Sequence, residues 1–229
     1  MSASLLPASL RRLTPERLRD DVRLRGLAVG WGLIPPRTMH SEEDARVLLE
    51  AARRAERVVE IGVYEGASAL VLCEMLGPDA ELHLVDPFGA HPDALPSGWG
   101  AAEWATRRVV GRAQRRRGSD APRVCWHVCL SAELAARWRG EVVDLVFIDG
   151  DHSEAGCELD WSQWHANVAR GGHVVFHDAR ADRPGGRGLP GPTAVVTRHF
   201  RSGGGTPGWE IVAEGDRTVA VRRTRREGD

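Results

Sequence analysis

Five acidic and imidazole side chains follow two apolar runs of the sequence. They are Asp149, Asp151, His152, His177 and Asp178. Carboxylates in such positions can hold a hard divalent cation such as Mg²⁺, and a bound cation lowers the pKa of a coordinated hydroxyl. An imidazole titrates near neutral pH, so His152 or His177 can instead take a proton directly. Asp149, His152 and His177 are therefore the candidate catalytic residues.

A second polar pattern surrounds a pair of glycines. Glu60 lies near the end of an apolar run, and Gly62 and Gly66 follow it before an apolar helical pattern begins. This order is typical of a strand, a tight turn and a helix start. Asp86 ends the next apolar run, where an acid can bind ribose hydroxyls. Tyr64 replaces the second glycine of a dinucleotide loop, and Glu60 would repel a pyrophosphate, so the pattern favours a cationic nucleoside over NAD.

These residues need a sheet to bring them together, and strands and helices alternate from residue 57 onward. The expected strands are Val58–Ile61, Leu82–Val85, Arg123–Val128, Val142–Ile148, His173–Phe176, Trp209–Ala213 and Thr218–Arg222. The expected helices between them are Ser68–Leu76, Ala101–Arg116, Ala132–Trp138, Glu154–Val168 and Thr193–Phe200. Five βα units and a terminal hairpin predict a Rossmann-like, seven-stranded, mostly parallel α/β sheet with helices on both faces. The hairpin is expected to supply one antiparallel edge strand. Ligands of such sheets bind at the carboxyl ends of the strands.

The region before residue 41 is predicted to be separate from this sheet. Pro15 favours a helix start and the residues up to Leu24 continue it, before glycines and prolines interrupt the chain. Ser41 and Asp44 form a capping-box pattern at the start of a further helix that runs to about Arg54.

Composition excludes several classes of partner. The chain has 229 residues, a formal net charge of −1 and arginine as its only strongly basic residue type. This balance predicts no polyanionic partner, so no nucleic acid is expected. No apolar stretch is long enough to span a bilayer, and the N-terminus lacks the pattern of a secretory signal. We therefore expect a cytoplasmic protein without membrane contact.

Four segments together resemble a known family. VVEIGVYEGASAL, HLVDPF, FIDGDHSEAGCELD and GGHVVFHDA are similar to class I S-adenosylmethionine (SAM)-dependent O-methyltransferases of the macrocin and catechol O-methyltransferase-like group. The resemblance covers about Ser41 to Arg222 and is closest to the D-G-D-H branch. It implies SAM as cofactor, with contacts from Glu60, Gly62, Gly66, Asp86, Ser131 and Asp149. It also implies Mg²⁺ or another divalent cation on Asp149 and Asp178, although Ala179 replaces the amide ligand that catechol-type relatives have next.

The resemblance also implies a function. We expect O-methylation of a hydroxyl on a small natural-product or sugar-like acceptor, as in secondary metabolism, with magnesium assistance. Residues 41–229 would form the SAM-binding methyltransferase domain, and residues 1–40 an N-terminal helical segment that contributes to the acceptor site or to a homodimer. A non-catalytic SAM-binding module and methyl transfer to nitrogen or to RNA are the alternatives.

Overall fold

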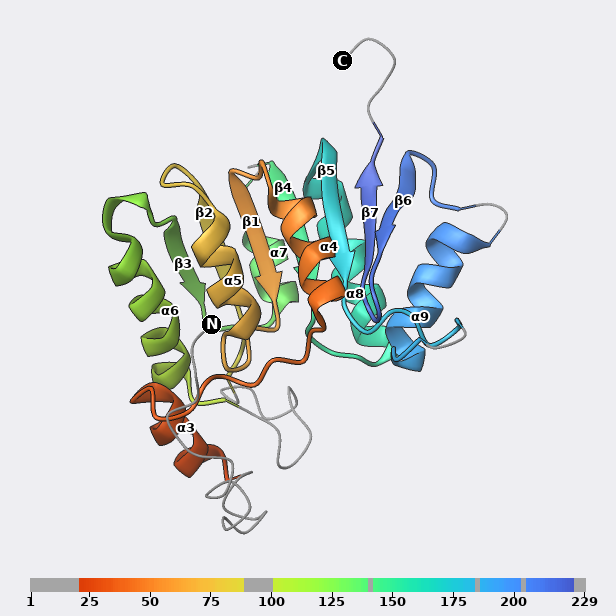
Figure 1. The fold of residues 1–229 in the computed structure, drawn as a ribbon. Coiled ribbons are helices and arrows are strands. Elements are labelled where there is room, and N and C mark those ends of the chain that lie inside the picture. The colour runs from red at the N-terminus through yellow and green to blue at the C-terminus, as the bar shows by residue number, and fades with distance from the viewer. Residues whose placement is uncertain (1–20, 89–100, 140–141, 184–185, 203–204, 225–229) are drawn as a thin grey trace.

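A computed structural model describes residues 21–88, 101–139, 142–183, 186–202 and 205–224. The predicted helix start at Pro15 lies outside these residues. The described part of the chain forms one seven-stranded sheet with helices on both faces (Figure 1). Its strands are β1 (Arg57–Ile61), β2 (Glu81–Val85), β3 (Arg123–His127), β4 (Val143–Ile148), β5 (Val168–Phe176), β6 (Trp209–Glu214) and β7 (Val219–Arg223). The predicted fold class is confirmed.

The strand order is β3-β2-β1-β4-β5-β7-β6. The strands from β1 to β5 pair in parallel, and β7 is antiparallel to both β5 and β6. The prediction of an antiparallel edge strand was wrong in position, because β7 lies between β5 and β6 and the edge strand is β6. The return of the hairpin to β5 places its turn beside the carboxyl end of β5, which brings a further segment to the predicted site.

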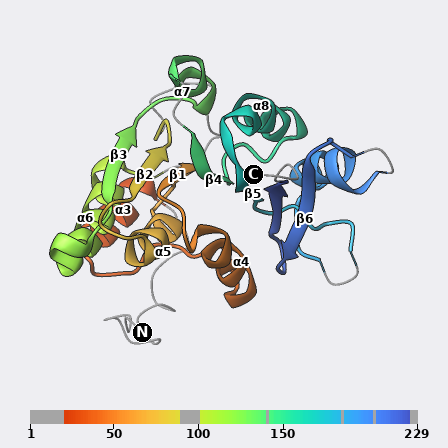
Figure 2. The same ribbon diagram turned by 90° about the horizontal axis from the view of Figure 1, so that it is seen from above.

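Two hydrophobic clusters fill the space between the sheet and its helices. One face is covered by α4 (Glu42–Ala52), α5 (Ala67–Met75) and α6 (Glu103–Arg117). The other face is covered by α7 (Ser131–Arg137), α8 (Glu154–Trp164) and α9 (Pro190–Val196). Figure 2, viewed from above, shows α4 to α6 on one side of the strands and α7 and α8 on the other. The central strands are apolar on both faces, as expected of a parallel sheet covered by two helical layers.

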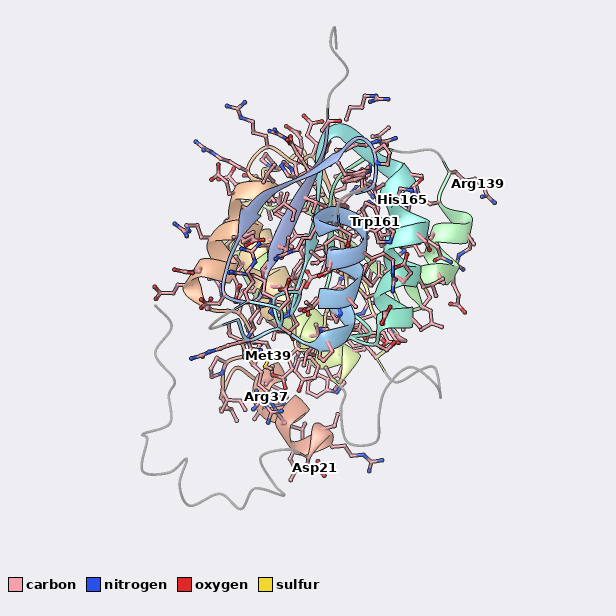
Figure 3. The ribbon with its side chains drawn as sticks, turned by 90° about the vertical axis from the view of Figure 1, so that its right-hand side faces the viewer. Asp21, Arg37, Met39, Arg139, Trp161 and His165 are labelled. Carbon is pink, nitrogen blue, oxygen red and sulfur yellow. The ribbon has the colours of Figure 1, made fainter. Side chains whose placement is uncertain are left out.

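The helix α3 (Val22–Gly30) lies beyond the carboxyl ends of the parallel strands (Figure 1). Arg112 of α6 donates hydrogen bonds to the carbonyl oxygens of Val29 and Gly30 at the end of α3. Figure 3 shows Arg37 and Met39 above α3, in the segment that leads to α4. The predicted capping box at the start of α4 is present, since Ser41 and Asp44 exchange hydrogen bonds. Residues 21–40 are thus held at the edge where ligands of this fold bind.

Strand β5 begins earlier than the sequence predicts. The helix α8 ends at Trp164, a 3₁₀ turn η2 (His165–Asn167) follows, and β5 already starts at Val168. The pairing of β4 with β5 shifts register between Val143 and Leu145, where residues 169–172 bulge. No helix within the described ranges is both long and apolar enough to cross a membrane.

Candidate active site

Neighbouring strands bring the predicted acids and histidines together. Ile148 pairs with Phe176 at the ends of β4 and β5, so the next residues of each strand, Asp149 and His177, lie side by side. The Nδ1 atom of His177 is 2.8 Å from Oδ1 of Asp149, and the Nε2 atom of His152 is 3.2 Å from the same oxygen. Asp149 is therefore the residue that both histidines contact.

Asp178 joins this cluster, whereas Asp151 turns away from it. Oδ2 of Asp178 lies 3.7 Å from Nδ1 of His177 and 3.8 Å from Nε2 of His152. Its other carboxylate oxygen is 3.2 Å from the guanidinium of Arg217, which comes from the turn between β6 and β7. Asp151 is exposed and accepts a hydrogen bond from the amide of Ser153 at the start of α8. Asp151 therefore stabilises a turn and takes no part in the cluster.

His40, from the segment before α4, is a further member of the cluster. Its Nε2 atom lies 3.6 Å from Oδ2 of Asp149, and its ring centroid is 4.3 Å from that of His177. The side chain is 9% exposed, and Nε2 has no hydrogen-bond partner. Three histidines from three distant segments thus surround one carboxylate.

Asp149, His152 and His177 stabilise each other's charged forms. Burial alone would raise the pKa of Asp149, but the charge and hydrogen bonds of His177 and His152 outweigh burial and lower it. The hydrogen bond to Asp149 raises the pKa of His152 above its ordinary value, against the effect of burial. Burial would lower the pKa of His177, yet Asp149 raises it overall. In His40 burial dominates and lowers the pKa.

The glycine turn lies directly beside this cluster. Gly62 has a φ of 88°, and a Cβ atom there would lie 2.1 Å from the carbonyl oxygen of Asp149. Only glycine allows the turn after β1 to approach the end of β4 so closely. Gly66, with a φ of 83°, is the N-cap of α5. The predicted strand–turn–helix arrangement is present, and it brings Glu60 to the same edge as Asp149.

Glu60 is a fully buried acid with one unsatisfied oxygen. Its Oε1 atom accepts a hydrogen bond from the hydroxyl of Ser68, a residue that the sequence analysis did not single out. Its Oε2 atom is buried and has no hydrogen-bond partner. Burial raises the pKa of Glu60 well above its ordinary value, and the nearby charges of Asp149 and Asp86 raise it further. Such a group favours a cationic ligand, because a positive charge would relieve the repulsion among the three carboxyl groups.

Asp86 is more deeply involved in the turn than the sequence predicts. Its Oδ2 atom accepts hydrogen bonds from the backbone amides of Val63 and Tyr64, and its Oδ1 atom accepts one from Phe88. A carboxylate has about four acceptor positions, so one remains for a ribose hydroxyl. The structural role of Asp86 is to shape the glycine turn, and its contact with a ribose stays a prediction.

Ser131 is the first residue of α7, directly after the loop that follows β3. Its hydroxyl donates a hydrogen bond to Asp160 of α8, whose pKa burial raises to about 6. Contact of Ser131 with an adenine stays a prediction.

Ala179, which follows Asp178, is fully buried and offers no ligand atom. Of the metal ligands that the resemblance implies, only the carboxylates of Asp149 and Asp178 are therefore present, and histidines surround them.

Comparisons with known proteins agree with this geometry. The family profile described as "Methyltransferase domain" matches residues 59–179, which is more than half of the chain. The chain belongs to this family. The matched region runs from Val59 in β1 to Ala179, and so contains the glycine turn and the cluster residues Asp149, His152, His177 and Asp178 but not His40. With the seven-stranded sheet, this makes the protein a class I SAM-dependent methyltransferase.

Solved structures share the fold of this methyltransferase at low sequence identity. Cofactor-bound Rv0187 from MTB is 19% identical with a TM-score of 0.58, and the match covers 96% of this chain and 98% of that one. The O-methyltransferase TomG from Streptomyces achromogenes, solved with SAM, is 16% identical with a TM-score of 0.56 and 95% coverage of both chains. CalS11, a TDP-rhamnose 3'-O-methyltransferase, is 16% identical with a TM-score of 0.54, covering 99% of this chain and 89% of that one. A search of curated proteins found no match.

Proposed function

We propose that this methyltransferase transfers the methyl group of SAM to a hydroxyl of a small natural-product or sugar-like acceptor. The observation that carries the proposal is the group of three carboxyls at one strand edge, with a buried, unpartnered oxygen on Glu60. SAM carries a sulfonium and an ammonium group and has no phosphate. Its positive charges suit the acids of this edge, and a phosphate-containing cofactor would be repelled there.

Different residues at this edge would contact different parts of the cofactor. Glu60 and Asp149 would face the positively charged methionine part, while Gly62 and Gly66 let the backbone come close to it. Asp86 would use its remaining acceptor position for a ribose hydroxyl. Ser131 would lie toward the adenine end. SAM supplies an activated methyl group, so the protein must chiefly align the acceptor for in-line attack and remove its proton.

His152 is the base that the geometry favours. Its side chain is 35% exposed and that of His177 is 1% exposed, so His152 is the more accessible of the two to an acceptor. The contact between Nε2 of His152 and Asp149 leaves Nδ1 to take the acceptor proton and stabilises the imidazolium that forms. His177 contacts the same oxygen of Asp149 and positions it. His152 would thus be the catalytic base, and His177 a positioning residue.

The hydroxyl acceptor is proposed because two matched structures are described as an O-methyltransferase of tomaymycin synthesis and as a TDP-rhamnose 3'-O-methyltransferase. Methyl transfer to nitrogen or RNA and a non-catalytic SAM-binding role are the alternatives. A panel of sugar nucleotides, phenols, amines and RNA, assayed for release of S-adenosylhomocysteine (SAH), distinguishes them. Turnover confined to hydroxyl compounds supports the proposal, and turnover confined to amines or RNA contradicts it.

Cofactor binding has a direct test in calorimetric titration with SAM, SAH and NAD. We expect SAM and SAH to bind in the micromolar range and NAD not to bind. Glu60→Gln leaves a group of the same shape that cannot ionise beside a bound cation, and it should weaken SAM more than SAH, because SAH lacks the sulfonium charge. The exposed Glu43→Gln is the matched control. Equal affinity of the Glu60 variant and the wild type for SAM would contradict the cofactor site.

A further inference from the structure

His40 offers a buried nitrogen that nothing in the described protein satisfies. Its Nε2 atom has no hydrogen-bond partner, its side chain is 9% exposed, and it lies 3.6 Å from Oδ2 of Asp149. Buried polar atoms normally have a partner, so an unpartnered one in a polar cluster indicates a missing ligand. The ring packs against the rings of His177 and Phe147, with centroid distances of 4.3 Å and 5.7 Å.

The geometry around His40 is that of a metal-ligand set. One ligand atom each from His40, Asp149 and His177 can be chosen so that all three lie within 4.8 Å of one another. The Nε2 atom of His40 lies 3.6 Å from Oδ2 of Asp149, and Nδ1 of His177 lies 2.8 Å from Oδ1 of the same carboxylate. Two ligands at about 2.1 Å from one ion are roughly 3 to 3.5 Å apart in octahedral or tetrahedral geometry. Small side-chain movements would therefore close these three atoms on an ion.

We propose that His40, Asp149 and His177 bind a first-row transition-metal ion of the Zn²⁺, Mn²⁺ or Co²⁺ class in preference to Mg²⁺. Two imidazoles and one carboxylate suit such borderline ions, whereas Mg²⁺ prefers oxygen ligands in an octahedron. The ion's place beside the acceptor rests on the proposed function, but ion binding itself requires no SAM.

A second choice of ligands exists in the same cluster and is less favourable. His152, His177 and Asp178 also offer atoms within 4.8 Å of one another. One oxygen of Asp178 is already paired with Arg217 at 3.2 Å, so part of its charge is neutralised. The His152 side chain is the most exposed of the three imidazoles in the cluster. The side chains of the set that contains His40 are 9%, 15% and 1% exposed, and this set leaves His152 available for the acceptor proton.

The experiment is a titration of the chelator-treated full chain with Zn²⁺, Co²⁺ and Mg²⁺, followed by calorimetry and, for Co²⁺, by visible absorption. We expect one equivalent of Zn²⁺ or Co²⁺ to bind at least about 100-fold more tightly than Mg²⁺. His40→Ala should weaken Co²⁺ binding at least about 10-fold, because even indirect support of a metal ligand commonly contributes that much. His173→Ala, on β5 and outside the cluster, is the matched control and should bind Co²⁺ like the wild type.

Three results would overturn the proposal. One is Mg²⁺ binding as tight as that of Zn²⁺, and another is a loss of Co²⁺ affinity in His152→Ala that equals the loss in His40→Ala. The third is a folded His40→Ala protein that binds Co²⁺ normally but SAH weakly, which would assign Nε2 to the cofactor. Thermal unfolding of each variant shows that it is folded. If Co²⁺ binds as expected and SAH does not bind at all, the proposed function fails and the metal site stands.

Discussion

Replacing Asp86 with Asn should loosen the glycine turn as well as weaken cofactor binding. The two oxygens of Asp86 accept three backbone hydrogen bonds, from Val63 and Tyr64 at 2.8 Å each and from Phe88 at 2.7 Å. Asn has one side-chain oxygen, and its NH₂ group cannot accept. Either the amide of Phe88 or both amides of the turn must therefore lose their acceptor in the variant.

The size of the effect follows from the number of bonds lost. A hydrogen bond to a charged group contributes about 1.5–3 kcal/mol. In the variant the amide of Phe88 loses its acceptor, and the amides of Val63 and Tyr64 bond to a neutral oxygen in place of a carboxylate. Together these losses predict a decrease of about 3 kcal/mol in the free energy of unfolding. For a chain of this size, about 1 kcal/mol shifts Tm by roughly 2–4 °C. Asp86→Asn should therefore lower Tm by about 6–12 °C.

Differential scanning calorimetry with and without SAH measures both effects. The exposed Asp79→Asn, in the turn before β2, is the matched control and should change Tm by less than about 1 °C. SAH should raise the Tm of Asp86→Asn by less than it raises that of the wild type, because a distorted turn binds it more weakly. A Tm equal to that of the wild type, with the same stabilisation by SAH, would refute this role of Asp86.

Three further predictions concern other parts of the site. Arg25 and Glu65 form a nearly buried pair that joins α3 to the glycine turn, so Arg25→Ala should cost about 3 kcal/mol in chemical denaturation. The double variant with Glu65→Gln should recover part of that loss; no recovery would mean that the pair is uncoupled. Burial would raise the pKa of Asp44, but its hydrogen bonds to Arg217, Thr218 and Ser41 outweigh it and lower the pKa. The ionised Asp44 therefore stabilises the fold above its unfolded-state pKa, and this contribution is lost as pH falls through the lower folded-state pKa. The stability of an Asp44→Asn protein should lack this part of the pH dependence below about pH 4. Once an acceptor is known, His152→Ala should reduce kcat by about 10²–10⁴ with little change in SAM affinity, and an unchanged kcat would remove His152 from the mechanism.

The sequence predicts the sheet well because the signals there are local. An apolar run that ends in Gly62 or Asp149 predicts both a strand and the position of its carboxyl end. In a parallel sheet the carboxyl ends of all strands lie at the edge where ligands bind. The predicted strand began at His173, because the residues from Val168 to Gly172 include a bulge that interrupts the regular pairing with β4. Such a bulge depends on the partner strand and has no separate local signal.

The composition of the site was only partly predictable, for a physical reason. Asp149 and His177 follow adjacent strands, so topology alone brings them together. His40 arrives through the segment before α4, and Arg217 arrives because β7 returns beside β5. These contacts depend on loop paths and on tertiary packing, which spacing does not encode. The unpartnered atoms of Glu60 and His40 are visible only once every neighbouring donor and acceptor is placed.

The central claim is that SAM binds at the carboxyl edge of β1, β2 and β4 with its methyl group beside Asp149 and His152. A crystal structure of the protein with SAH tests this most directly. We predict the ammonium group within hydrogen-bond distance of Glu60 or Asp149, a ribose hydroxyl on Asp86, and the sulfur facing His152. SAH bound at another edge of the sheet, or bound here with its sulfur turned away from His152, would contradict the account.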